Sequence, residues 1–197
     1  MKAFFTGIAM ILCMTVAAQK ITPLTYVENG AVLKPNETII YGSFLRKPGI
    51  WYDSDLHLVI IKNMETKELF SVPIETHSKA GKESVFCFYA KPGSYKIIAY
   101  RFEKAKWYGG LITTTLIFKN IDYNINLKAK IDSGLIKKED LSAVSFNIPN
   151  TGLFYVGKWH FETGTVFFTD EKVDLDKKMP KDFYFLYFNN ATTIIPD

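Results

Sequence analysis

SVFCFYAKPGSYKIIAYRF, residues 84–102, has the pattern of two β-strands joined by a tight turn. Ser84–Ala90 and Ser94–Phe102 are rich in β-branched and aromatic residues, which favour strands. Between them, Pro92 fixes its own φ and Gly93 permits a wide range of φ, a combination typical of a chain reversal. The sequence therefore predicts a hairpin at this point.

Similar runs, separated by Gly, Pro, Asn and Asp, follow along the chain. Two short helical segments are also predicted: Asp132–Asp140, with Asp or Ser as N-cap, and Asp174–Met179, which ends before Pro180. Many short strands with turn residues between them indicate an all-β, antiparallel β-sandwich formed by residues 19–197 as one domain. The other predicted strands are Thr38–Arg46, Leu56–Lys62, Glu68–Ile74, Ile112–Phe118, Tyr123–Lys128, Ala143–Ile148, Leu153–Phe161, Thr165–Thr169 and Phe183–Phe188.

Three of the predicted strands lack the alternation of a half-buried strand. Ser84–Ala90, Leu153–Val156 and Phe183–Phe188 are apolar or aromatic at nearly every position. We expect central strands covered on both faces, by the short C-terminal helix or by a wrapped loop. The alternative is an exposed aromatic patch that docks on a partner.

Two motifs carry a family resemblance. Phe86–Ile97 is similar to hairpins of prealbumin-like and carboxypeptidase-regulatory-like β-sandwiches of secreted bacterial proteins. Phe146–Gly157, with a strand, a Gly turn and an aromatic-valine-glycine step in that order, resembles one family of exported bacterial domains of unknown function. The resemblance covers residues 36–170. It implies a prealbumin-like sandwich in the cell envelope and assigns no catalytic residue.

The first eighteen residues have the pattern of a cleaved secretory signal. A basic start at Lys2 precedes an apolar run from Ala3 to Val16, and small residues lead to an expected cleavage after Ala18. The run is too short for a spanning helix, which needs about 20 apolar residues. Cys13 lacks the small preceding residue of a lipoprotein signal. The ending in Ala-Gln resembles signals of Bacteroidetes-type bacteria, so we expect export to the periplasm or outer membrane of a Gram-negative cell.

Composition narrows the class of protein further. The chain has 197 residues, of which 48% are hydrophobic and 22% charged, which excludes a disordered or collagen-like chain. The formal net charge is +4, and lysines alternate with acids, so no basic stripe for nucleic acid is present. No later window is apolar enough to span a membrane. Removal of residues 1–18 would leave Cys87 as the one cysteine, and its apolar neighbours predict a buried, unreactive thiol.

Few residues form patterns that are typical of a metal-binding or catalytic site. Asp53, Asp55 and His57 share one face of an extended chain, and His160 and Glu162 share another, but we interpret the first group as turn residues with a solvated His57 at a strand edge. No zinc or EF-hand motif is present, so no metal or cofactor is predicted. Neither Tyr41-Gly42-Ser43 nor Gly93-Ser94 forms a nucleophile elbow. The sequence therefore predicts no catalytic residue, although two distant carboxylates could still pair in a hydrolase.

Aromatic residues beside turns give the clearest indication of a binding surface. Trp51-Tyr52 follows a Pro-Gly turn, and Trp107-Tyr108 lies between two lysines and Gly109-Gly110, where we expect a hairpin tip. Aromatic rings on loops can stack on sugars or hold a protein partner, although they can also close the end of a core. We therefore expect a non-enzymatic interaction or structural module with an envelope protein partner or a glycan. The alternatives are a carbohydrate-binding module and a hydrolase.

Overall fold

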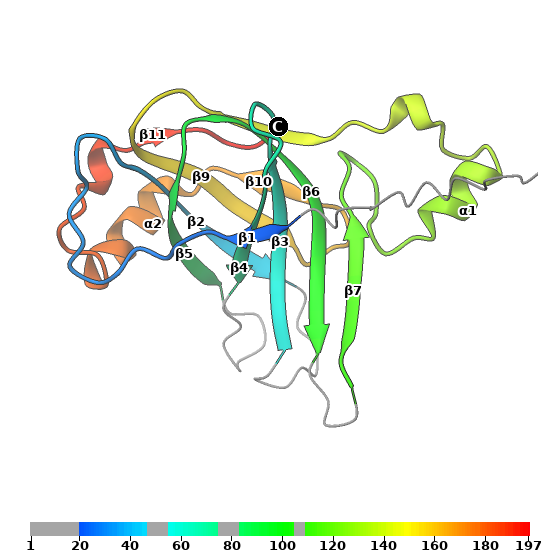
Figure 1. Cartoon of the computed structure of the whole chain (residues 1–197), viewed down its shortest axis with the longest axis horizontal. Helices are drawn as coiled ribbons and strands as arrows, with labels where there is room; N and C mark the ends of the chain where they lie inside the picture. The colour runs from blue at the N-terminus through cyan, green and yellow to red at the C-terminus, as the bar shows by residue number, and fades with distance from the viewer. Residues whose placement is uncertain (1–19, 47–54, 75–82, 105–108) are drawn as a thin grey trace, which may run out of the picture.

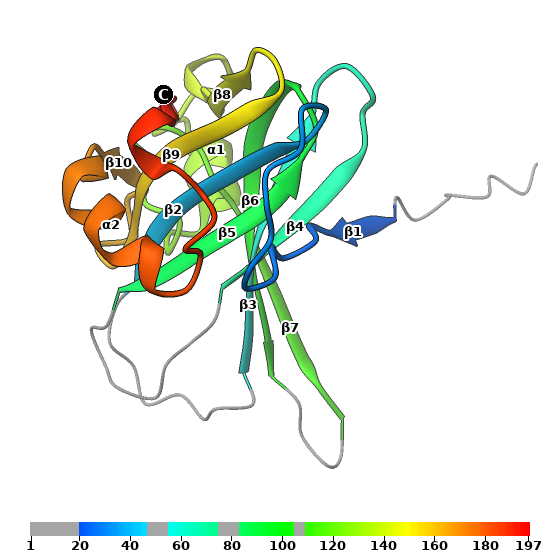
Figure 2. The same cartoon turned by 90° about the vertical axis from the view of Figure 1, so that its left-hand side faces the viewer.

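The computed structural model describes residues 20–46, 55–74, 83–104 and 109–197, and this part of the chain is mostly β. The elements form two sheets that face each other (Figures 1 and 2). The first sheet has the order β1 (Ile21–Pro23), β4 (Leu69–Ile74), β3 (Asp55–Asn63), β6 (Gly93–Lys104) and β7 (Leu111–Leu116), with β8 (Val144–Ile148) also on β6. The second has the order β10 (Phe167–Thr169), β9 (Gly152–Phe161), β2 (Thr38–Arg46) and β5 (Ser84–Ala90), with β11 (Thr192–Thr193) on β9.

The sheets are mixed, which corrects the prediction of a purely antiparallel fold. β1 runs parallel to β4, and β9 runs parallel to both β2 and β11. A two-residue alternation reports which face of a strand is buried and carries no information on the direction of its neighbour. Parallel partners must be joined by long connections, and Thr38 of β2 lies opposite Gly152 of β9.

The predicted hairpin over residues 84–102 is wrong in its pairing. Both strands exist, but β5 pairs with β2 in the second sheet and β6 pairs with β3 in the first. The turn at Lys91 and Pro92 therefore leads the chain from one sheet to the other. The Tyr95 hydroxyl donates to the Lys91 carbonyl oxygen at 2.8 Å and braces this crossing.

One shared core lies between the sheets, and a second core lies on the outer face of the second sheet. Val59, Ile97 and Phe146 of the first sheet meet Phe86 and Trp159 of the second. On the outer face, Ile39, Tyr41, Cys87 and Tyr155 are buried beneath α2 (Lys172–Lys178) and the segment after it. This confirms that Ser84–Ala90 and Leu153–Val156 belong to strands covered on both faces.

A β-bulge in β9 decides which of its residues face the shared core. Tyr155 lies opposite Tyr41 and Lys158 lies opposite Ser43, so Val156 and Gly157 together face Gly42. Gly157 has a φ of +90°, a conformation that suits glycine. The extra residue reverses the alternation: Phe154 and Val156 face the core before the bulge, and Trp159 and Phe161 face it afterwards. Lys158 and His160 are thereby directed to the outer face.

Two predicted strands are not strands. Tyr123–Lys128 forms a turn and the beginning of α1 (Leu127–Asp132), and Asp132–Asp140 contains the end of α1 and a 3-10 turn at Lys138–Asp140. Phe183–Phe188 wraps over the second sheet: Phe183, Leu186 and Phe188 are buried, whereas Tyr184, Phe185 and Tyr187 are exposed. Further 3-10 turns lie at Met179–Lys181 and Phe188–Asn190. Within the described ranges, no helix is long and apolar enough to cross a membrane.

Candidate functional site

A cleft of about 1380 Å³ opens beside the free edge of the first sheet. Its walls come from β6 and β7, from residues 121–127, and from the turn between β9 and β10. Residues 117–143 leave the first sheet between β7 and β8, and Figure 1 shows that this excursion carries α1 outward on the β7 side. The lining includes His57, Tyr100, Phe102, Thr113, Tyr123 and Glu162.

The 121–127 wall is fixed to the second sheet by a compact turn. Asp122 Oδ1 accepts hydrogen bonds from the backbone N–H of Asn124 at 2.8 Å and from its Nδ2 at 3.0 Å. The Tyr123 N–H donates to the Gly164 carbonyl oxygen at 2.9 Å. Gly164 has a φ of +89°, and a Cβ on it would lie 2.6 Å from Asp122 Oδ1. Glycine is therefore required for the two turns to meet.

Aromatic rings in mutual contact form the base of the cleft. The Tyr100 ring lies 5.5 Å from that of Phe161 and 6.2 Å from that of Tyr123. The Tyr123 hydroxyl donates to the Phe161 carbonyl oxygen at 2.6 Å, and burial raises the pKa of Tyr123 above its usual value. His57 packs against Tyr100 and Phe102. These contacts hold the rings rigidly in place, and Tyr100, Phe102 and Tyr123 each remain partly exposed.

The rim is rich in neutral polar side chains. Thr113, Thr114, Asn124, Asn126 and Thr163 line the cleft and are exposed. Asn126 also holds the start of α1, because its side chain accepts from the Ala129 N–H at 3.1 Å. The charged groups of the lining are Lys104, Asp122 and Glu162. The cleft thus combines an aromatic base with hydroxyl and amide groups around it.

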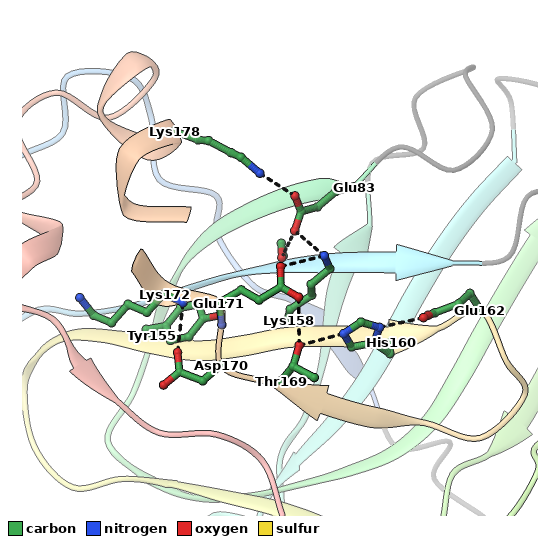
Figure 3. A network of polar contacts seen from close by, with 11 residues as sticks. Glu83, Tyr155, Lys158, His160, Glu162, Thr169, Asp170, Glu171, Lys172 and Lys178 are labelled. Atoms are coloured by element: carbon green, nitrogen blue, oxygen red, sulfur yellow. Dashed lines mark hydrogen bonds and ion pairs between the residues drawn. The ribbon is translucent and has the colours of Figure 1, made fainter. Parts of the chain in front are cut away.

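A network of polar contacts runs from the cleft across the outer face of the second sheet (Figure 3). We use the name polar network for eight of the residues drawn there: Glu162, His160, Thr169, Glu171, Lys158, Glu83, Ser43 and Lys178. Glu162 Oε1 lies 2.7 Å from His160 Nδ1, and His160 Nε2 lies 2.9 Å from the Thr169 hydroxyl. Lys158 Nζ lies 2.9 Å from Glu171 Oε2 and 3.4 Å from Glu83 Oε1. Lys178 Nζ donates to Glu83 Oε2 at 2.9 Å and ties the network to α2.

Charge pairing within the polar network offsets the burial of its groups. Burial by itself raises the pKa of Glu83, but hydrogen bonds from Ser43 and Lys178 and the charge of Lys158 outweigh it and lower the pKa. Burial by itself lowers the pKa of Lys158, but Glu171 and Glu83 outweigh it and raise the pKa. Both residues therefore stay charged at neutral pH. The network acts as an electrostatic clamp between β9, the chain before β5, and α2.

Thr169, His160 and Glu162 are bonded in the order hydroxyl, imidazole, carboxylate, which is the order of a catalytic triad. Their surroundings do not suit a nucleophile. Thr169 and His160 are not part of the cleft lining, and the Phe167 ring stacks on the His160 ring with centroids 4.2 Å apart. The Thr169 hydroxyl also lies 3.4 Å from Glu171 Oε1. These bonds are best explained as cross-strand contacts that lock β10 onto β9.

The structure corrects one sequence prediction and confirms another. His57 is not a solvated edge residue: β3 lies between β4 and β6, and His57 is only 2% exposed and shares a hydrogen bond through Nδ1 with the Tyr100 hydroxyl. Cys87 is a buried free thiol, and burial raises its pKa strongly. His160 and Glu162 do lie together, but the described residues hold no group of three or more His, Cys, Asp or Glu side chains that could bind a metal.

Several predicted residues lie outside the described part of the chain. Trp51, Tyr52, Trp107 and Tyr108, the predicted contact surface, all fall there, as do Asp53 and the signal segment 1–18. The surrounding hairpin is confirmed, because β6 and β7 pair antiparallel from Lys104 and Leu111.

Sequence reasoning missed the cleft itself. Asn124 and Asn126 fall inside the predicted strand Tyr123–Lys128, although both are turn and cap formers, and Asp122 lies in the turn predicted just before it. The close spacing of these three residues was the signal in the sequence that indicated a turn and a helix start in place of a strand. The meeting of Tyr123 with Phe161 and Glu162 could not be inferred, because it joins residues about forty positions apart through their tertiary packing.

Comparisons with known proteins found no match: no family model, no curated protein and no solved structure resembles this chain significantly.

Proposed function

We propose that this chain is an exported cell-envelope protein that works by binding a partner, without catalysis, and that the cleft beside β7 is its binding surface. The observation that carries the proposal is the cleft: about 1380 Å³ with a rigid aromatic base and an exposed polar rim. Binding sites are typically concave, largely preformed, and mostly apolar with a few placed polar groups. The pattern of residues 1–18 supports export, and the facing sheets are compatible with a prealbumin-like domain.

The hydrolase alternative would need reactive groups at the same cleft. Its two carboxylates, Asp122 and Glu162, are already engaged, the first with Asn124 and the second with His160. A general acid and base must be able to reach the substrate and exchange protons with it. The cleft therefore favours a module that holds its ligand over one that transforms it.

A blocking variant tests the proposal. Thr113 is exposed in the cleft on β7, so Thr113→Trp should fill the opening without disturbing the shared core. Thr193→Trp is the matched control, since Thr193 is exposed in a strand outside the cleft lining. Binding of the chain beginning at Gln19 to an envelope extract of its own organism would be measured on an immobilised surface. Loss in Thr113→Trp with retention in Thr193→Trp is expected.

Two results would overturn the proposal. Equal binding of both variants would show that the cleft is not the binding surface. Turnover of any ester, peptide or glycoside in a chromogenic substrate panel, abolished by Thr113→Trp, would make the protein an enzyme.

A further inference from the structure

We infer that the ligand of the cleft is a neutral, polyhydroxylated molecule, an oligosaccharide or glycan segment longer than a single sugar ring. The inference rests on the proposed function, because it names the ligand class of the same cleft. Four features of the cleft carry it: size, base, rim and charge.

Size indicates an extended ligand. The cleft volume of about 1380 Å³ exceeds the roughly 300–1,000 Å³ typical of pockets for drug-sized molecules. Leu111, Thr113 and Leu116 of β7 line the cleft and are exposed to solvent, so a chain of sugar units could reach it from the surface.

The base offers flat apolar surfaces of the kind that sugar rings pack on. Tyr100, Phe102 and Tyr123 are partly exposed in the cleft and are held by their neighbours. An aromatic face is electron-rich, and the C–H groups on one side of a pyranose ring carry partial positive charge, so the two surfaces attract and both lose water. Rings that are fixed before binding lose little conformational freedom when a ligand arrives.

The rim offers the matching hydrogen-bonding groups. Thr113 and Thr163 present hydroxyls and Asn124 and Asn126 present amides, all exposed at the cleft. Hydroxyls and amides can both donate and accept, as sugar hydroxyls do. A purely apolar ligand would leave these groups without partners, which costs free energy for each group that is desolvated.

Charge argues for a neutral ligand. The lining holds one lysine, Lys104, which is too little for a polyanion. Its two carboxylates are held by neighbouring groups and are not free to turn towards a cation: Asp122 Oδ1 receives two hydrogen bonds from Asn124, and Glu162 Oε1 pairs with His160. Glu162 Oε2 is enclosed and has no hydrogen-bond partner among the described residues. A glycan without charged groups fits this lining better than an acidic polymer or an ammonium ligand.

The first test measures binding of defined sugars by calorimetry. The probes are neutral hexasaccharides of glucose, mannose, galactose and N-acetylglucosamine, with hexagalacturonate as the charged counterpart. Thr113→Val with Thr115→Val removes two hydroxyls of the cleft and keeps the β-branched shape that suits a strand. Thr192→Val with Thr193→Val makes the same change in β11, outside the cleft lining. Binding of a neutral probe that is weakened about tenfold by the first pair alone is expected, as two neutral hydrogen bonds would give.

The second test does not depend on which sugar is chosen. Periodate cleaves vicinal diols, which 2-, 4- and 6-linked neutral hexoses carry, so periodate treatment of the envelope extract should abolish binding of such a glycan to the chain, whereas protease treatment should leave binding unchanged. Binding that survives both treatments would still support the glycan class and would indicate a glycan without vicinal diols, such as a 1→3-linked hexose chain or 1→4-linked N-acetylglucosamine. Binding that survives periodate, is lost to protease and is still blocked by Thr113→Trp would refute the glycan class and preserve the proposed function. Preferred binding of hexagalacturonate would refute the neutral class. Extract binding that Thr113→Trp does not affect would instead remove the proposed function itself.

Discussion

Gly42 and Gly157 approach each other so closely across the parallel pair of β2 and β9 that a Cβ on Gly42 would lie 2.5 Å from the Gly157 carbonyl oxygen. It would also lie 2.7 Å from Cζ of Phe86. Both contacts are shorter than real Cβ contacts, and one of them is to backbone. The bulge of β9 therefore requires glycine at position 42 of the neighbouring strand β2, in addition to Gly157 itself.

Gly42→Ala should destabilise the protein substantially. The strand pair or Phe86 must move to admit one methyl group in the middle of the core, at a cost of about 1–3 kcal/mol. Gly110→Ala is the control, because its Cβ would meet nothing closer than 3.4 Å, and it should change stability by less than about 0.5 kcal/mol. Urea unfolding followed by tryptophan fluorescence measures both. Equal midpoints for the two variants would contradict the close approach.

Replacing Glu83 should make the free energy of unfolding depend less on pH under acidic conditions. Its pKa is lowered in the folded protein, so the stabilisation that it provides is fully present above its unfolded value of 4.5 and is lost as the pH falls through the lower folded value. Glu83→Gln should therefore lose less stability than the wild type as the pH falls below about 4.5. Urea midpoints across that range, with exposed Glu139→Gln as control, test the difference.

Replacing Lys158 alone should destabilise the protein more than replacing Lys158 and Glu83 together. It is 14% exposed and lies between Glu83 and Glu171, so Lys158→Met leaves two carboxylates facing each other. We expect a loss of about 1–3 kcal/mol for Lys158→Met, because Glu171 loses its charged partner and Glu83 keeps only Lys178. A double variant with Glu83→Gln should recover part of that loss. Strict additivity in the double-mutant cycle would show that the two residues do not interact.

Buried tyrosines should titrate late. Burial raises the pKa of Tyr155 to about 12, and it also raises the pKa of Tyr41, Tyr95 and Tyr123. A tyrosine whose folded pKa is raised keeps its stabilising contribution below the unfolded value of 10.0, and loses it as the pH rises towards the folded value. Tyrosinate absorbance should therefore rise in two phases, the second together with unfolding. A single phase centred near the unfolded value would contradict the burial of these side chains.

Cys87 should be unreactive until the protein unfolds. The thiol is fully buried beneath Val85 and the C-terminal segment, and its raised pKa keeps it protonated. In the chain beginning at Gln19, a disulfide-exchange reagent should label one thiol quickly in denaturant and none in buffer. Rapid labelling in buffer would mean that the outer core opens readily.

The positions of several strands could be predicted from composition alone. The neighbours with which these strands pair in the sheets could not. Thr38–Arg46 and Ser84–Ala90 were predicted to the residue, because β-branched and aromatic runs are bounded there by clear turn residues. Neither run indicates that β2 would lie between an antiparallel and a parallel neighbour. Pairing is a long-range property of the packed sheets, and the turn at Pro92-Gly93 is as suitable for crossing between sheets as for a hairpin.

Phe183–Phe188 shows a second limit of sequence reasoning. Its aromatic density fits a fully buried strand, yet only Phe183, Leu186 and Phe188 are buried. An irregular segment can anchor itself on a core through three apolar side chains, and composition cannot distinguish such a segment from a strand. The cleft was hidden for a related reason, since its lining residues come from separate segments that meet only in the folded protein.

The parallel pair of β2 and β9 also has a consequence for the export that we propose for this chain. β2 begins at Thr38, and its partner Gly152 follows more than a hundred residues later, so the second sheet cannot close while the chain is still emerging from a narrow channel. Proteins dominated by such distant contacts fold slowly, in milliseconds to seconds. If the chain is exported as proposed, this late closure would keep it unfolded while it crosses the membrane and would delay compaction until nearly the whole sequence has crossed.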